Sequence, residues 1–156
     1  MKIDLLVPLL LFGLAPPGLA QAPRTTASAV EPAARPAAAT VEAFHQALER
    51  GDTKVALSYL SEDALIFESG GVERGKREYA SHHLAADAQF SKAVPSKVTR
   101  RIGHVAGADA WIATEGRTTG VFKGKAVDRR TVETMILRRT GGSWKIVHIH
   151  WSSGPA

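Results

Sequence analysis

Residues 126–152, AVDRRTVETMILRRTGGSWKIVHIHWS, decide the fold. Strand-forming residues such as Val, Ile, Thr and Trp fill both sides of Gly141-Gly142, a pattern typical of two strands joined by a tight turn. Two similar segments precede them, over 97–106 and 110–122, separated by Gly107-Ala108 and followed by Lys123-Gly124. Such short connections favour hairpins, so we predict a four-stranded antiparallel meander with strands over 97–106, 110–122, 126–140 and 144–152.

The residues before the meander favour helices. Thr40 can cap a helix that ends at Gly51, and Asp52 can cap a second, short helix. A short strand is expected over 64–68, and a third helix from about residue 76 to residue 91. Two to three N-terminal helices packed on an antiparallel sheet give an α+β domain with one concave face.

The three tight turns predict which side chains lie opposite each other. They place Arg101 beside Thr114, Thr114 beside Glu133, and Glu133 beside His150. Because successive side chains alternate between faces, one face should carry Arg101, Thr114, Glu133, Met135, His148 and His150. The other face should carry Trp111, Val132, Ile136, Val147, Ile149 and Trp151. The second set is an apolar patch too large for a monomer to expose comfortably, so we expect a homodimer.

The order of these elements, together with GGSWKIVHIHWSSG at 141–154, resembles the nuclear transport factor 2-like superfamily. The most similar branches are the SnoaL-like domains and the association domain of calcium/calmodulin-dependent protein kinase II. Phe67-Glu68 and Glu133-Thr134 also match that association domain. The resemblance covers about residues 40–154 and implies a cone-shaped α+β fold with a curved antiparallel sheet that encloses a pocket, often in a dimer. It does not specify the function, because this fold serves enzymes, binding proteins and assembly modules alike.

Three residues form the candidate catalytic set: His150, His148 and Glu133. Alternate residues of one strand project both imidazoles to the same side, and a carboxylate on the next strand can raise the basicity of one ring. Such a set suits a general base. It can equally be a structural group that satisfies hydrogen bonds inside the cone, or a set of ligand contacts.

A second set of residues is expected to contact a ligand: Tyr79, His83, Arg101, Thr114 and Met135. Tyr79 and His83 lie on one stripe of the third predicted helix, and Arg101 could pair either with a ligand anion or with Glu133. His83 and Asp87 are one helical turn apart, so with His148 and His150 they could share a metal ion. A semi-buried histidine held by its own helical carboxylate explains this spacing equally well, and we expect no metal.

Other classes of chemistry are disfavoured. The chain has no cysteine, no Gly-rich phosphate loop and no GxSxG or HExxH motif, so we expect no cofactor. The net charge is +5, and the basic residues concentrate after residue 97. Apart from Phe122, no aromatic residue is interleaved with Lys123, Lys125, Arg129, Arg130, Arg138 and Arg139, so nucleic acid is not expected as a partner. This basic cluster is either a solvated rim or a surface attracted to anionic envelopes.

The N-terminal residues have the pattern of a targeting segment. Lys2, an apolar stretch over 5–14 and Ala20-Gln21-Ala22 are typical of a cleaved signal peptide, here 1–22. Residues 23–39 are rich in Ala and Pro, which predicts a disordered tether. The folded domain is then 40–156, exported to the periplasm or secreted, with no integral membrane segment after cleavage.

These observations predict an exported domain that binds a small apolar or weakly acidic ligand in a pocket inside an α+β cone. Two alternatives stay open. One is a cofactor-free acid–base enzyme (an isomerase, dehydratase or cyclase) that uses the His/Glu pocket, and the other is a homo-oligomeric assembly module. The identity of the ligand is not encoded in any motif of the chain.

Overall fold

The computed structural model describes residues 30–156, and the predicted signal peptide and the first part of the tether lie outside these residues. The described helices are η1 (Pro32–Ala34), α1 (Arg35–Arg50), α2 (Thr53–Tyr59), α3 (Lys76–His82) and α4 (Leu84–Ala93). The strands are β1 (Leu60–Glu68), β2 (Gly71–Arg74), β3 (Ser96–Ala106), β4 (Asp109–Phe122), β5 (Lys125–Thr140) and β6 (Ser143–Pro155). The predicted α+β class is confirmed.

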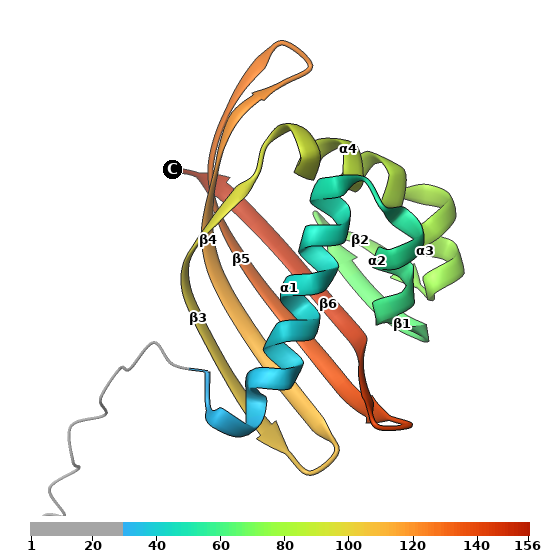
Figure 1. Cartoon of the computed structure of the whole chain (residues 1–156). Coiled ribbons are helices and arrows are strands. Elements are labelled where there is room, and N and C mark those ends of the chain that lie inside the picture. Colours follow the sequence, from blue (N-terminus) through green and yellow to red (C-terminus); the bar gives the residue numbers. More distant parts are fainter. Residues whose placement is uncertain (1–29) are drawn as a thin grey trace, which may run out of the picture.

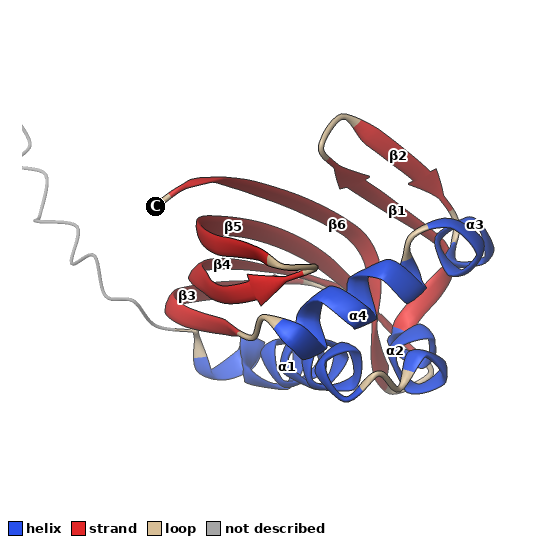
Figure 2. Cartoon of the chain, turned by 90° about the horizontal axis from the view of Figure 1, so that it is seen from above, coloured by secondary structure: helices blue, strands red, loops and turns tan. Residues whose placement is uncertain are grey.

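One curved sheet carries the domain, with strand order β2-β1-β6-β5-β4-β3. Helix α1 runs along one face of this sheet (Figure 1), and seen from above the sheet curves around the helices (Figure 2). We call the face toward α1 the inner face and the opposite one the outer face. The long predicted meander is confirmed as β3 to β6, with each strand within three residues of its expected bounds.

The sheet is mixed, whereas the sequence predicted an antiparallel one. Strand β1 pairs in parallel with β6, with Ile66 opposite Ile149, and antiparallel with the short strand β2. The chain between β1 and β6 passes through two helices and four strands, and parallel neighbours require such a long crossover. The local sequence over 60–74 does not indicate that β1 pairs with β6.

The predicted start of the first helix at Thr40 is wrong, because α1 begins at Arg35. Pro36 fits the first helical turn, where its missing N–H costs nothing. Ala34 and Ala37 are fully buried, so the small side chains of the supposed tether bring the helix close to the sheet. Residues 30–39 therefore belong to the folded unit, and Val30 even forms a bridge with Gly103.

The third predicted helix is two helices that meet at His83. The expected stripe of Tyr79 and His83 is wrong at His83, because the break rotates α4 and buries Leu84 and Ala88 instead. By contrast, the helix end at Gly51 and the Asp52 cap are confirmed. Gly51 has a φ of +75°, and the Asp52 carboxylate accepts a hydrogen bond from the Val55 N–H.

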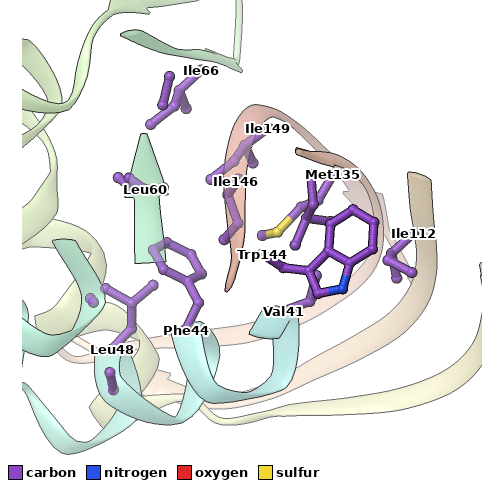
Figure 3. Close-up of a cluster of buried hydrophobic side chains, with 14 of the residues drawn as sticks. Val41, Phe44, Leu48, Leu60, Ile66, Ile112, Met135, Trp144, Ile146 and Ile149 are labelled. Atoms are coloured by element: carbon purple, nitrogen blue, oxygen red, sulfur yellow. The ribbon is translucent and has the colours of Figure 1, made fainter. Parts of the chain in front are cut away.

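Apolar side chains fill the space between α1 and the inner sheet face (Figure 3). The fully buried ones include Val41 and Phe44 from α1 and Ile112, Met135 and Ile146 from three strands. Burying one such side chain is worth about 1.5–3 kcal/mol, so this cluster supplies much of the stability of the domain. It also fixes α1 on the sheet and so positions the polar residues that α1 carries.

A bulge in β6 changes the register that the tight turn predicts. Leu137 lies opposite Ile146 as expected, but His148 then lies opposite Ile136, so Val147 is an extra residue. Beyond it every side chain of β6 changes face, as a one-residue shift requires. Glu133 therefore lies opposite Trp151, which corrects the predicted pair with His150, and Met135 lies opposite Ile149.

The outer face is also different from the expected one. Ile149 is fully buried in the inner core and Trp151 packs against it, whereas the sequence placed both outside. Trp111, Val132 and Ile136 do lie on the outer face and are 40%, 53% and 36% exposed. The outer apolar patch is thus smaller than predicted. Within residues 30–156, no helix has the length and apolar character to cross a membrane.

Candidate functional site

A cavity of about 440 Å³ lies against the inner sheet face, beyond the apolar cluster. Its wall comes from α1, α4 and strands β4, β5 and β6, and the turn after β1 closes one side. Leu48, Phe90 and Val94 supply apolar surface, while His45 and Glu133 bring titratable groups. Ligand pockets of about 300–1,000 Å³ commonly combine such an apolar wall with a few polar groups.

Glu133 is the centre of the polar group on the sheet side of the cavity. Its side chain is only 8% exposed, and its Oε2 accepts hydrogen bonds from His45 Nε2 and from Trp151 Nε1, both at 2.7 Å. The other oxygen, Oε1, is buried and has no hydrogen-bond partner among the described residues. Buried carboxylate oxygens are usually bonded, so this atom has spare capacity to accept a hydrogen bond.

The His45–Glu133 contact favours the charged form of both groups. Burial by itself would lower the pKa of His45, but the adjacent Glu133 carboxylate outweighs burial and raises it. Burial would raise the pKa of Glu133, but the His45 ring and the hydrogen bonds from His45 and Trp151 lower it. Both shifts favour the imidazolium–carboxylate form of the pair at the cavity wall.

Arg101 extends this network away from the cavity. Its Nε donates to Thr114 Oγ1 at 3.2 Å, and its Nη1 donates to Glu42 Oε2 at 2.9 Å. The guanidinium is the main cause that lowers the pKa of Glu42, through the hydrogen bond. Arg101 thus holds α1 to the sheet beside His45, and its fork is occupied by protein groups.

A second polar pair lies on the helical side of the cavity. The Tyr79 hydroxyl, from α3, donates to Asp87 Oδ2, from α4, at 2.8 Å. Burial raises the pKa of Asp87, and burial together with Asp87 raises the pKa of Glu68 and of Tyr79. A carboxyl group that resists ionisation beside an apolar wall is suited to exchange a proton at near-neutral pH.

The predicted catalytic set is not brought together. Glu133 faces the cavity side, but His148 and His150 lie on the outer face because of the bulge. The His148 ring bonds the Leu65 carbonyl oxygen at 2.8 Å through Nδ1, and both rings contact Phe67 edge-on. The structural interpretation of these two histidines, which the sequence left open, agrees with this geometry.

The five predicted ligand contacts are spread over four places. Thr114 lines the cavity, whereas Met135 is fully buried in the apolar cluster and Arg101 is engaged by Glu42. Tyr79 and His83 line a neighbouring hollow of about 300 Å³, which shares Glu68, Ser69 and Asp87 with the cavity. His83 and Asp87 do not meet His148 and His150, which point away on the outer face.

The sequence reasoning missed His45 and Trp151. A signal for His45 was present, because it lies one helical turn after Val41 and so borders the buried stripe of α1. Trp151 was assigned to the wrong face by the same one-residue shift that misplaced the histidines. Among the described residues, one further group could hold a metal ion, formed by Glu73, Glu78 and His82 at the junction of β2 and α3.

The family model for the SnoaL-like domain matches residues 37–156. This chain belongs to the SnoaL-like domain family. The match begins close to the start of α1 and covers every strand of the sheet. No curated protein matches the sequence of this SnoaL-like domain.

Solved structures support the same assignment. A protein assigned as a ketosteroid isomerase from Shewanella frigidimarina NCIMB 400 is 33% identical, with a TM-score of 0.71 over 74% of this chain and 94% of that one. An assigned dehydratase of the NTF2-like family from Streptomyces avermitilis is 21% identical, with a TM-score of 0.69 over 80% and 97% of the two chains. An assigned calcium/calmodulin-dependent protein kinase II association domain from Xanthomonas campestris is 21% identical, with a TM-score of 0.68 over 81% and 94%. The last two show the shared nuclear transport factor 2-like fold.

Proposed function

We propose that this SnoaL-like domain binds a small, mainly apolar ligand in the cavity of about 440 Å³. The observation that carries the proposal is the cavity itself, because the inner face is filled by apolar side chains near Trp144 yet left open near Thr114. The His45–Glu133 pair would orient a polar group at one end of the ligand, and the Tyr79–Asp87 pair would do so at the other.

A four-ring ketosteroid is the first probe, since the similar Shewanella frigidimarina protein is assigned as a ketosteroid isomerase. Trp151 lines the cavity, whereas Trp111 is on the outer face and Trp144 lies in the apolar cluster. We expect saturable quenching of tryptophan fluorescence that persists in Trp111→Phe and disappears in Trp151→Phe. Equilibrium dialysis measures binding independently of fluorescence.

Filling the cavity provides a matched test. Ala86 lines the cavity from α4, and its neighbour Ala85 is exposed and does not. Ala86→Trp should weaken binding at least tenfold, and Ala85→Trp should bind as the wild type does. Equal affinity in both variants, or no binding of the steroid or of a panel of smaller apolar probes, would overturn the proposal.

A second candidate function is cofactor-free proton transfer on the bound ligand. It is favoured by Asp87, whose raised pKa and contact with Tyr79 suit a general acid or base at the cavity wall. Asp87 would move a proton between two carbons of an unsaturated ketone, and absorbance of the conjugated product measures the reaction. Asp87→Asn should abolish turnover but leave dialysis affinity within a factor of a few. Wild-type protein that binds without turnover leaves ligand binding as the function.

Export and dimerisation complete the proposal. The signal-peptide pattern in 1–22 supports secretion or a periplasmic location, and the sequence of the mature protein should begin at Gln21 or Pro23. Intact Met1 on cytoplasmic protein would contradict export.

The outer apolar residues Trp111, Val132 and Ile136 support a homodimer through the outer face.

A further inference from the structure

A second cluster of titratable side chains lies outside the large cavity, where β2 meets α3. Glu73 is in β2, and Glu78 and His82 are one helical turn apart on α3. Each offers one ligand atom, and these atoms all lie within 4.8 Å of one another. The expected ligand binding does not use any of the three, so the cluster needs a separate explanation.

Glu73 is the unusual member, because it is a carboxylate with only 5% exposure. Its hydrogen-bond partners among the described residues are two half-exposed imidazoles, His82 and His83, and they include no arginine, lysine or backbone N–H. A buried carboxylate is costly unless it is paired with a cation or coordinates a metal. Imidazole is also among the commonest metal ligands, so His82 can serve as a ligand beside Glu73.

The spacing suits a small transition-metal ion. Glu73 Oε2 and His82 Nδ1 are 3.3 Å apart. Two ligand atoms about 2.0–2.2 Å from a tetrahedral zinc ion are separated by about 3.3–3.6 Å. The Glu73 and His82 atoms therefore already have the spacing of two ligands of one zinc ion, and the Glu78 ligand atom lies within 4.8 Å of both.

The surrounding contacts support the same arrangement. His83 Nδ1 bonds the second oxygen of Glu73, which fixes the carboxylate in the way that outer groups orient metal ligands. The Arg74 N–H donates to Glu78 Oε2, so Glu78 has its other oxygen available. Glu73 also borders the hollow of about 300 Å³ beside Tyr79, where water can complete the coordination.

We propose that Glu73, Glu78 and His82 bind a divalent transition-metal ion, zinc above all, with His83 as a positioning residue. Two carboxylates and one imidazole neutralise a divalent charge and match the nitrogen and oxygen preference of such ions. The bound ion would tie β2 to α3 at the rim of the domain. This site is independent of ligand binding in the large cavity, and it departs from the expectation of no metal.

The test uses tag-free protein treated with chelator and titrated with ZnCl₂ by calorimetry. We expect one saturable site, and thermal unfolding should shift upward by several degrees at a hundredfold excess over Kd. Cobalt(II) in place of zinc should give the intense visible absorption bands of a tetrahedral site. Glu73→Gln and His82→Ala should each abolish binding, and His83→Ala should weaken it about 10–100-fold.

His104→Ala is the matched control, because His104 makes a similar exposed contact with Glu31 at 2.7 Å but is not in the three-ligand group. It should bind zinc as the wild type does. Circular dichroism verifies that each variant is folded, and Glu78→Gln gives a second test if Glu73→Gln does not fold. No saturable binding, or equal binding in wild type and His82→Ala, would overturn the site and show that Glu73 is held by histidines alone.

Discussion

The two ends of the inner sheet face are built from the same strands but serve different purposes. At the end near Trp144, Leu137 and Ile146 pack against α1 and leave no room for a ligand. At the other end, Thr114, Gly116 and Glu133 of the same strands line a cavity of about 440 Å³. The comparison shows that stability and binding capacity are divided along the strands rather than between separate elements.

The bulge at Val147 lies between these two ends. Before it, β6 follows the register of its tight turn, and after it Ile149 and Trp151 point inward in place of His148 and His150. Trp151 then stacks near Phe44, with ring centroids 6.3 Å apart, and donates to Glu133. One extra residue thus changes the wall of the cavity from two imidazoles to an indole.

Ile149→Arg should have the largest effect. The bulge places Ile149 opposite Met135 on the inner face, where it is fully buried. An unpaired charge buried in an apolar core is severely destabilising, so we expect no cooperative unfolding transition. Circular dichroism with urea measures it. A variant as stable as the wild type would show that Ile149 faces outward and would contradict the bulge.

Ile146→Ala tests the filled end. Ile146 is fully buried, and truncation of such a side chain leaves a cavity that costs about 2–5 kcal/mol of unfolding free energy. Ser91→Ala at the open end is the control and should change stability by less than about 0.5 kcal/mol. Urea denaturation measures both variants, and equal losses would contradict the division between the two ends.

Glu133→Gln tests the ion pair at the open end. The His45 pKa is raised by Glu133, so the variant should lower it. In the wild type, this histidine contributes stability below its ordinary pKa of about 6.5 and loses it as pH rises through the raised value. That pH dependence of the unfolding free energy should flatten in the variant.

NMR titration of the His45 ring measures this pKa, with urea denaturation across pH 5–9 as the second readout. An unchanged His45 titration in Glu133→Gln would show that the pair does not carry the charge we assign to it.

Val132→Arg should have the smallest effect on the stability of the subunit. Val132 is 53% exposed on the outer face, so the free energy of unfolding should change by less than about 0.5 kcal/mol. If the outer face is a dimer interface, the variant should sediment as a monomer at concentrations where the wild type is a dimer. Ile149→Arg is no test of the dimer, because Ile149 is in the core. A wild-type monomer at micromolar concentration would contradict the proposed dimer.

The difference between the inner and outer sheet faces also shows which features of the fold could be predicted from the sequence. The bounds of β3 to β6 to within three residues, the Gly51 helix end, the Asp52 cap and the Arg101–Thr114 contact all follow from local patterns, and all are confirmed. The parallel pairing of β1 with β6 could not be predicted, because nothing in a short strand specifies a partner some 80 residues away. The same limit applied to the candidate site, because a single bulge in β6 places His148 and His150 on the outer face and not in the cavity wall.

The sequence by itself determined the α+β class, the meander and the resemblance to the nuclear transport factor 2-like superfamily, because turn residues and strand periodicity act over a few neighbouring residues. Only the tertiary structure decided which groups meet at the cavity. His45 reaches Glu133 from 88 positions away, and Trp151 joins them only because a bulge shifts β6 by one residue. Such contacts depend on how α1 packs across the sheet and on the balance of buried area between two registers, and neither is set by any local segment.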